Sequence, residues 1–109
     1  IDHKLLMMKL QGFGFSDALV SFFGSYLGDR SQFVSWEGRL SNSYPAGSGV
    51  PQGSNLGPLL FLLFINDIVD CVKNSHILIY ADDIKIFTRV MDRSSQFELQ
   101  DDLDRITAW

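Results

Sequence analysis

The stretch that decides the fold of this chain is His76-Ile77-Leu78-Ile79-Tyr80-Ala81-Asp82-Asp83-Ile84-Lys85-Ile86-Phe87-Thr88. Its two apolar runs are rich in isoleucine and aromatic residues and are separated by almost nothing, which favours two strands joined by a tight turn. Two adjacent acidic residues, Asp82 and Asp83, lie at the break. Because side chains alternate along a strand, the tight turn is what lets both carboxylates approach one cleft.

The adjacent carboxylates indicate metal chemistry. Like charges repel, and partial burial between apolar strands makes ionisation costly, so folding alone gives no reason to place Asp82 beside Asp83. A divalent cation removes the repulsion, since Mg²⁺ takes oxygen ligands from one or two carboxylates and completes its octahedron with water and substrate phosphates. The competing interpretation is that the two aspartates only mark a solvated hairpin turn. The rest of the chain decides between these interpretations.

A loop rich in turn-forming residues precedes the hairpin and leads into an apolar helix. The loop covers residues 44–54 and includes Pro51, Gln52 and Gly53. Pro58 follows it and suits the first turn of a helix, where its missing N–H costs nothing. Residues 59–65 are apolar on nearly every side of that helix, so we expect the helix to be buried on all faces.

Two more helices and a hairpin are predicted nearer the start of the chain. Asp2 can cap a short helix that runs through Leu10. Ser16 can cap a second helix, and Gly28 is placed to end it in the left-handed conformation. From residue 31 the apolar period changes, which favours two extended segments joined by a turn at residues 37–39.

The last segment, residues 95–109, is predicted to be an amphipathic surface helix. It begins with the capping-box pattern Ser95-x-x-Glu98. Its apolar face is expected to carry Leu99, Leu103 and Ile106, and its charged face Asp101, Asp102, Asp104 and Arg105. With no internal repeat and no linker, the whole chain is expected to be one continuous piece of one α+β domain.

Composition and charge narrow the function classes. Apolar residues make up 46% of the chain and charged residues 20%, which is typical of a folded globular chain. The net charge of −4 is the wrong sign for a free-standing nucleic-acid binder, whose phosphate contacts need clustered Lys and Arg. The single cysteine, Cys71, excludes an internal disulfide, and the distant His3 and His76 receive no metal role.

Membrane insertion is not expected. The longest apolar run, residues 58–65, is far too short to cross a hydrocarbon layer of about 30 Å as a helix. The N-terminus has neither a basic region nor the apolar core of a signal peptide. The protein is therefore expected to be intracellular, with no membrane partner.

Taken in order, these segments resemble the reverse transcriptases of non-LTR, LINE-like retrotransposons, and most of all those of the jockey and CR-one type. Tyr80-Ala81-Asp82-Asp83 between hydrophobic strands is similar to the turn motif of that family. The likeness covers nearly the whole chain and also includes Ile1-Asp2-His3-Lys4-Leu5-Leu6, Tyr26-Leu27, Arg30-Ser31-Gln32, Gly49-Val50-Pro51-Gln52-Gly53-Ser54, Leu56-Gly57-Pro58-Leu59-Leu60-Phe61 and Ile65-Asn66-Asp67.

The resemblance implies a fold and a reaction. The fold would be a partial polymerase palm with part of the fingers, in which a metal-binding β-hairpin packs on helices. The reaction would be RNA-directed DNA synthesis, in which a DNA primer 3′-hydroxyl is extended with dNTPs on an RNA template. Two Mg²⁺ ions, or Mn²⁺ in their place, would serve as cofactors. An acidic palm fits this role, because carboxylates hold cations there while basic surfaces elsewhere grip the nucleic acid.

The resemblance also implies residue roles. Asp82 would be a principal metal ligand and Asp83 a second acidic partner. Tyr80 and Ala81 would line the floor under the primer end. Pro51, Gln52 and Gly53 would contact the template and nucleotide and help to seat the base pair being formed.

By the same resemblance the chain is incomplete. Family members bring a third catalytic aspartate from a strand that ends before the position matching Asp2, which we interpret as a helix cap. The chain opens at Ile1 without methionine and stops at Trp109 in a helical run, so residues 1–109 are expected to be a partial reverse transcriptase domain truncated at both ends. Its partners would include the remaining fingers and the thumb, and the parent would work in the nucleus and cytoplasm.

The isolated piece is predicted to bind Mg²⁺ weakly and to polymerise nothing. An alternative remains open at this point. The chain could derive from a non-catalytic, palm-like scaffold that binds RNA or protein, or from the relic of an inactive element.

Overall fold

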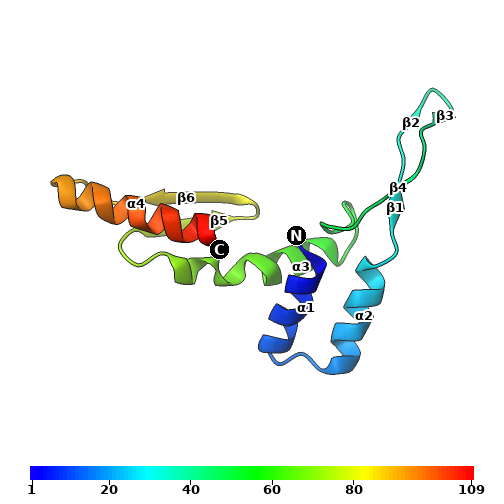
Figure 1. The fold of residues 1–109 in the computed structure, drawn as a ribbon, viewed down its shortest axis with the longest axis horizontal. Coiled ribbons are helices and arrows are strands. Elements are labelled where there is room, and N and C mark those ends of the chain that lie inside the picture. The colour runs from blue at the N-terminus through cyan, green and yellow to red at the C-terminus, as the bar shows by residue number, and fades with distance from the viewer. The chain divides into compact units, whose positions relative to one another are not determined.

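The computed structural model describes residues 1–109 and has the mixed helix and sheet content expected of an α+β chain. The chain divides into two compact units, Ile1–Phe64 and Ile65–Trp109 (Figure 1). All of the sheets are two-stranded and antiparallel. No helix combines the length and apolarity that a membrane span requires.

The first unit is built on helices α1 (His3–Gly12) and α2 (Asp17–Leu27), which pack against each other. Both predicted caps are confirmed. The backbone N–H of Leu5 donates to Asp2 Oδ1 at 2.8 Å, and that of Leu19 donates to Ser16 Oγ at 3.4 Å. The buried core of this unit consists of Leu6, Leu10, Val20, Phe23, Leu27 and Leu60.

The end of α2 differs from the prediction. Gly28 does cap the helix, and its N–H donates to the carbonyl oxygen of Gly24 at 2.9 Å, but its φ is −74° rather than left-handed. The left-handed residue is the next one, Asp29, with φ 53°. A Cβ at position 28 would lie 3.0 Å from the Gly24 oxygen, so close packing and not the dihedral angle favours glycine here.

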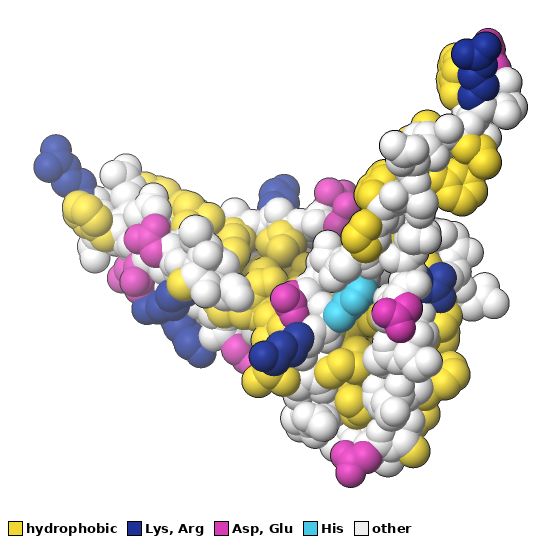
Figure 2. All heavy atoms as spheres, turned by 45° about the vertical axis from the view of Figure 1, so that its right-hand side comes forward, with side chains coloured by type: hydrophobic (Ala, Val, Ile, Leu, Met, Phe, Trp, Pro, Cys, Tyr) yellow, Lys and Arg dark blue, Asp and Glu magenta, His cyan; other side chains and the backbone are white.

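An extended antiparallel arm follows α2. Strand β1 (Ser31–Gln32) pairs with β4 (Tyr44–Pro45), and β2 (Ser35–Trp36) pairs with β3 (Arg39–Leu40). The predicted turn is confirmed: Glu37 and Gly38 both have the positive φ that two-residue hairpin loops favour. Figure 2 shows hydrophobic side chains exposed along this arm, which include Phe33, Val34, Trp36, Leu40 and Tyr44.

Helix α3 (Gly57–Ile65) closes the first unit, and the expectation that it is buried on all faces is wrong for this chain. Leu60 is fully buried, but Leu59 is 48% exposed and Leu62 is 51% exposed. The reason is that the residues of α1 and α2 offer α3 one apolar face only. Near its end, Lys9 Nζ donates to the carbonyl oxygen of Phe64 at 2.9 Å and satisfies an acceptor that the helix leaves open.

The second unit contains the predicted hairpin. A 3₁₀ helix, η1 (Asn66–Cys71), leads to strands β5 (His76–Tyr80) and β6 (Asp83–Phe87). In the antiparallel register, His76 lies opposite Phe87 and Tyr80 lies opposite Asp83. The period of two is visible in β5, where alternate side chains, those of Ile77 and Ile79, are half-buried.

Helix α4 (Arg93–Ala108) starts before the predicted capping box, so that prediction is wrong. The cap is Asp92, whose Oδ1 accepts from both the backbone N–H and the hydroxyl of Ser95 at 2.9 Å. Asp satisfies the free N–H groups of a first helical turn better than Ser in the turn itself, because its carboxylate also meets the positive end of the helix.

Candidate active site

The turn that carries the predicted metal ligands has two residues. Tyr80 and Asp83 form the last pair of the hairpin, so Ala81 and Asp82 make the connection. All four residues are exposed, with an exposed fraction of 84% for Tyr80, so the expected partial burial of Asp82 and Asp83 between the strands is wrong. The structure therefore presents the adjacent carboxylates at the accessible tip of a defined hairpin, which is the placement that a metal site shared with a large substrate requires.

The donor set at this tip fits Mg²⁺ in kind. Two carboxylates supply hard oxygen ligands, and Mg²⁺ commonly binds to proteins through one or two carboxylates while water and substrate phosphates complete its shell. Within residues 1–109, no group of three or more His, Cys, Asp or Glu side chains forms a metal cluster. The tip is thus chemically suited to part of a metal site.

Backbone strain is present beside the carboxylates. Ala81 has φ 53°, in the left-handed region that residues with a Cβ rarely adopt. We expect Ala81→Gly to raise the free energy of unfolding by about 1 kcal/mol, because the strain removed exceeds the extra chain entropy that glycine loses. Denaturant unfolding of the chain measures this change. Ala46→Gly is the control, since Ala46 has no positive φ, and a loss of stability in both variants would contradict the assignment of strain.

The predicted loop Pro51, Gln52 and Gly53 lies in the first unit and is held by its own hydrogen bonds. Gly53 has φ 77°, which only glycine adopts without strain. The hydroxyl of Ser54 donates to the carbonyl oxygen of Pro51 at 2.7 Å and accepts from the N–H of Gly57 at 3.0 Å. Ser54 therefore ties the loop to the start of α3.

Two cavities border the loop. One, of about 220 Å³, is lined in part by Arg30, Gln32, Pro51 and Gln52, and another, of about 370 Å³, also includes Pro51 and Gln52. The loop residues that the sequence singled out are therefore accessible from two hollows of the first unit. The sequence predicts no role for His3. In the structure, His3 Nε2 donates to the carbonyl oxygen of Gly49 at 2.7 Å, and this hydrogen bond holds the segment that leads into the loop.

The close approach at Gly57 gives a test of the loop geometry. A Cβ there would lie 2.9 Å from both the Pro51 carbonyl oxygen and Ser54 Oγ, so we expect Gly57→Ala to displace the loop and to destabilise the chain by about 2 kcal/mol. Gly47→Ala is the matched control, because a Cβ at that position meets nothing within 4 Å. Amide chemical shifts of residues 52–54 and denaturant unfolding report the two effects. Equal behaviour of the two variants would show that the loop tolerates the contact.

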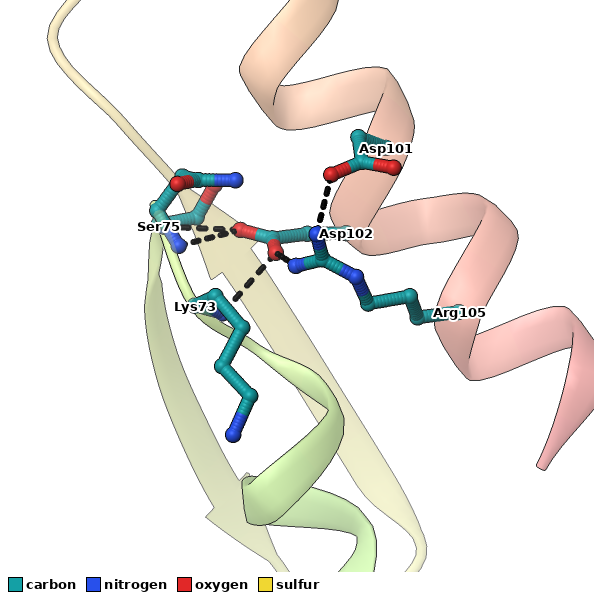
Figure 3. Close-up of polar contacts among 6 residues, drawn as sticks. Lys73, Ser75, Asp101, Asp102 and Arg105 are labelled. Carbon is teal, nitrogen blue, oxygen red and sulfur yellow. Dashed lines mark hydrogen bonds and ion pairs between the residues drawn. The ribbon is translucent and has the colours of Figure 1, made fainter.

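Sequence reasoning missed the most deeply buried polar group of the chain. Asp102 was predicted on the charged face of α4, but it is fully buried, whereas the side chain of its neighbour Asp101 is 54% exposed. Figure 3 shows its carboxylate directed at the segment that leads into β5. It accepts from the backbone N–H groups of Lys73, Asn74 and Ser75 at 2.8 to 2.9 Å, and Arg105 Nη1 donates to it at 3.0 Å.

A signal for this placement existed in the sequence. Ser95, Leu99, Asp102 and Ile106 are spaced by four, three and four residues, which puts them on one face of a helix. Asp102 therefore stands between two apolar residues of the inner face. The charge of Asp102 predicts the solvent-facing side of α4, whereas its helical spacing predicts the inner side.

Hydrogen bonding keeps this buried carboxylate ionised. Burial raises the pKa of Asp102, but the N–H groups of Lys73, Asn74 and Ser75 lower it further than burial raises it, and the resulting pKa lies below the ordinary value of 3.8.

Comparisons with known proteins agree with the sequence pattern. The family model described as reverse transcriptase (RNA-dependent DNA polymerase) matches residues 1–109. The chain is 37% identical over 93 residues to the RNA-directed DNA polymerase from mobile element jockey of Drosophila melanogaster, which covers 78% of this chain and 10% of that protein. It is 32% identical over 96 residues to the probable RNA-directed DNA polymerase from transposon X-element of the same organism, which covers 81% of this chain and 11% of that protein. The chain spans about a tenth of the length of these relatives. No solved structure gives a significant match.

Proposed function

We propose that this chain, which belongs to the reverse transcriptase (RNA-dependent DNA polymerase) family, carries the metal-binding turn of an RNA-directed DNA polymerase of the non-LTR retrotransposon type. The observation that carries the proposal is the exposed pair Asp82 and Asp83 at a two-residue turn, in a chain matched by the family over residues 1–109. A hairpin with a purely structural role gains nothing from neighbouring like charges at its tip. A polymerase gains ligands for divalent cations.

In the proposed mechanism, Asp82 is a principal metal ligand and Asp83 a second acidic ligand. These carboxylates would hold two Mg²⁺ ions, or Mn²⁺ in their place, which would supply activation of the primer 3′-hydroxyl and charge stabilisation of the leaving pyrophosphate. The hairpin holds both carboxylates at one point, and Tyr80 and Ala81 form the surface under the primer end. By the same proposal, the remaining protein ligand would come from outside the pair.

The loop of the first unit has a proposed role in substrate binding. Pro51, Gln52 and Gly53 seat the template base and the incoming dNTP, and the neighbouring cavities give these substrates room to approach. Support comes from the internal bracing by Ser54, since a loop that positions a substrate must be held rigid before the substrate arrives. The RNA template and DNA primer also need basic surfaces, which an acidic chain of net charge −4 leaves to the rest of the polymerase.

Primer extension tests the proposal. We expect the polymerase that contains this chain to extend a DNA primer on an RNA template with dNTPs and Mg²⁺, and to stop when the metal is removed by a chelator. The isolated 109-residue chain should give no extension, because its two carboxylates lack the remaining ligand and the substrate grip. If the complete protein binds RNA and yet extends no primer with either metal, the proposed polymerase function is wrong and the alternative function, a non-catalytic palm-like scaffold, takes its place. Extension by the isolated chain would refute its predicted incompleteness.

A further inference from the structure

Asp102 occupies a place where the second unit needs a core residue. The buried side chains of that unit are Ile65, Ile68 and Asp102, so a carboxylate takes one of very few interior positions. Burying a carboxylate costs several kcal/mol unless hydrogen bonds compensate, and an apolar residue is often as stable at such a place. Since Leu99 and Ile106 flank it on the same helical face, an apolar residue would suit the packing pattern. Packing alone therefore does not explain why a charged residue, Asp102, occupies this position.

The geometry shows what the carboxylate does. Three successive backbone N–H groups, those of Lys73, Asn74 and Ser75, converge on its two oxygens (Figure 3). Successive N–H groups that face one point form an anion-binding nest, and here the anion is built into the chain. Residue 76, the next one, is the first residue of β5. Asp102 thus fastens α4 to the base of the hairpin that ends in Asp82 and Asp83.

We propose that Asp102 is a positioning residue of the polymerase, whose carboxylate fills the nest of residues 73–75 and fixes the direction in which the hairpin carrying Asp82 and Asp83 leaves the body of the second unit. The proposal rests on the proposed metal-binding role of that pair. The hairpin has only two strands, and a two-stranded ribbon does not hold its own direction firmly in water. The link at its base supplies a constraint in addition to the packing of the half-buried Ile77 and Ile79.

A small movement at the base becomes a large one at the tip. The five residues of β5 span about 17 Å at the rise of a strand, so a tilt of roughly 5° at residue 76 shifts the tip by about 1.5 Å. A displacement of about 1 Å is enough to lower a catalytic rate by up to a hundredfold. Loss of the nest contact should therefore act on the chemical step even though Asp102 touches no substrate.

Chemical rescue separates positioning from general stability. In the polymerase that contains this chain, Asp102→Ala removes the carboxylate and leaves space that a formate ion can enter, while the nest of N–H groups remains. We expect kcat to fall by about 10- to 100-fold with KM for dNTP nearly unchanged. Formate, and not chloride at the same ionic strength, should restore several-fold of the lost kcat. Asp104→Asn is the matched control, because that exposed carboxylate accepts only from Gln100 and its change should leave kcat unaltered.

Amide hydrogen exchange provides a readout that needs no activity. In Asp102→Ala the amides of residues 73–75 and of the turn 80–83 should exchange faster, and formate should slow them again. If Asp102→Ala fails to fold, Asp102→Asn keeps one acceptor oxygen and should show the same changes at smaller size. Rates and exchange equal to those of Asp104→Asn would overturn the proposal, and so would a loss of kcat that formate does not reverse. Failure of the metal-binding assignment itself is distinct, since it appears as full activity of Asp82→Asn.

Discussion

Asp82→Asn is expected to lower the rate of primer extension by the complete polymerase on the order of a thousandfold. Loss of one preorganised electrostatic group costs about 10² to 10³ in kcat, and a metal-binding carboxylate supplies such a group. Asn keeps the size of the side chain but loses the negative charge, so its oxygen is a poor ligand for a hard cation. Because Asp82 is exposed, the change should leave the fold intact. Single-turnover extension on an RNA template measures the rate, and far-ultraviolet circular dichroism checks the fold.

The matched comparison for this prediction uses carboxylates of the same second unit. Asp104→Asn removes the same charge from an exposed position on α4 and should leave extension unchanged. Asp83→Asn, at the second ligand, should give a loss smaller than or similar to that of Asp82→Asn. An Asp82→Asn polymerase as fast as the wild type would end the assignment of the hairpin tip as a metal site, and with it the function proposed for the chain.

Local patterns predicted the elements of this fold well, because each depends on residues close together in sequence. The caps at Asp2 and Ser16, the turn at Glu37 and Gly38 and the hairpin around Asp82 all follow from single side chains or from a period of two or 3.6. The same logic failed where two candidates competed within a few residues. At α4 the Ser95 pattern predicts the cap, but the carboxylate of Asp92, three residues earlier, is the acceptor that caps the helix.

Burial was harder to predict than secondary structure, because it depends on what the rest of the chain offers. Leu59 and Leu62 in α3 have the hydrophobicity of core residues, yet the first unit presents a partner for only one face of that helix. Asp102 shows the opposite case, since its charge predicts exposure and its partners are backbone N–H groups about thirty positions away. Every residue except proline has the same backbone N–H, so the sequence does not indicate which N–H groups will bind a given carboxylate.

The sequence predicts the part of the candidate site that is formed by residues of one short segment. Asp82 and Asp83 are neighbours, and their repulsion is a property of the dipeptide itself. The support beneath them is not local. Asp102 comes some twenty residues later and acts on a segment that precedes the hairpin, so only the folded chain shows the connection.

Asp102→Ala is expected to lower the free energy of unfolding of the chain by about 3 kcal/mol, the largest stability change predicted here for any single residue. Removing the acceptor of part-buried donors leaves them unsatisfied, which costs about 1 to 3 kcal/mol for a neutral donor and more where a charged group takes part. Here the N–H groups of Lys73, Asn74 and Ser75 would lose their acceptor, and Arg105 would keep only its contact with the more exposed Asp101. Denaturant unfolding measures the change, with Asp104→Ala as the control and an expected cost below about 0.5 kcal/mol.

Acid titration of the same chain tests whether the stabilisation comes from the ionised carboxylate. The pKa of Asp102 in the folded chain lies below the ordinary 3.8, so its contribution is complete above that value and is lost as pH falls through the lowered pKa. Hydrogen bonds from Ser95 lower the pKa of Asp92 as well, so the wild-type curve alone mixes two groups. The difference between wild type and Asp102→Asn cancels the part due to Asp92. That difference should be fully present above the ordinary pKa of 3.8 and should shrink as pH falls through the lowered pKa of Asp102, because the protonated carboxyl is then as neutral as the Asn amide. A difference that stays constant over this range would mean that shape, and not charge, makes Asp102 stabilising.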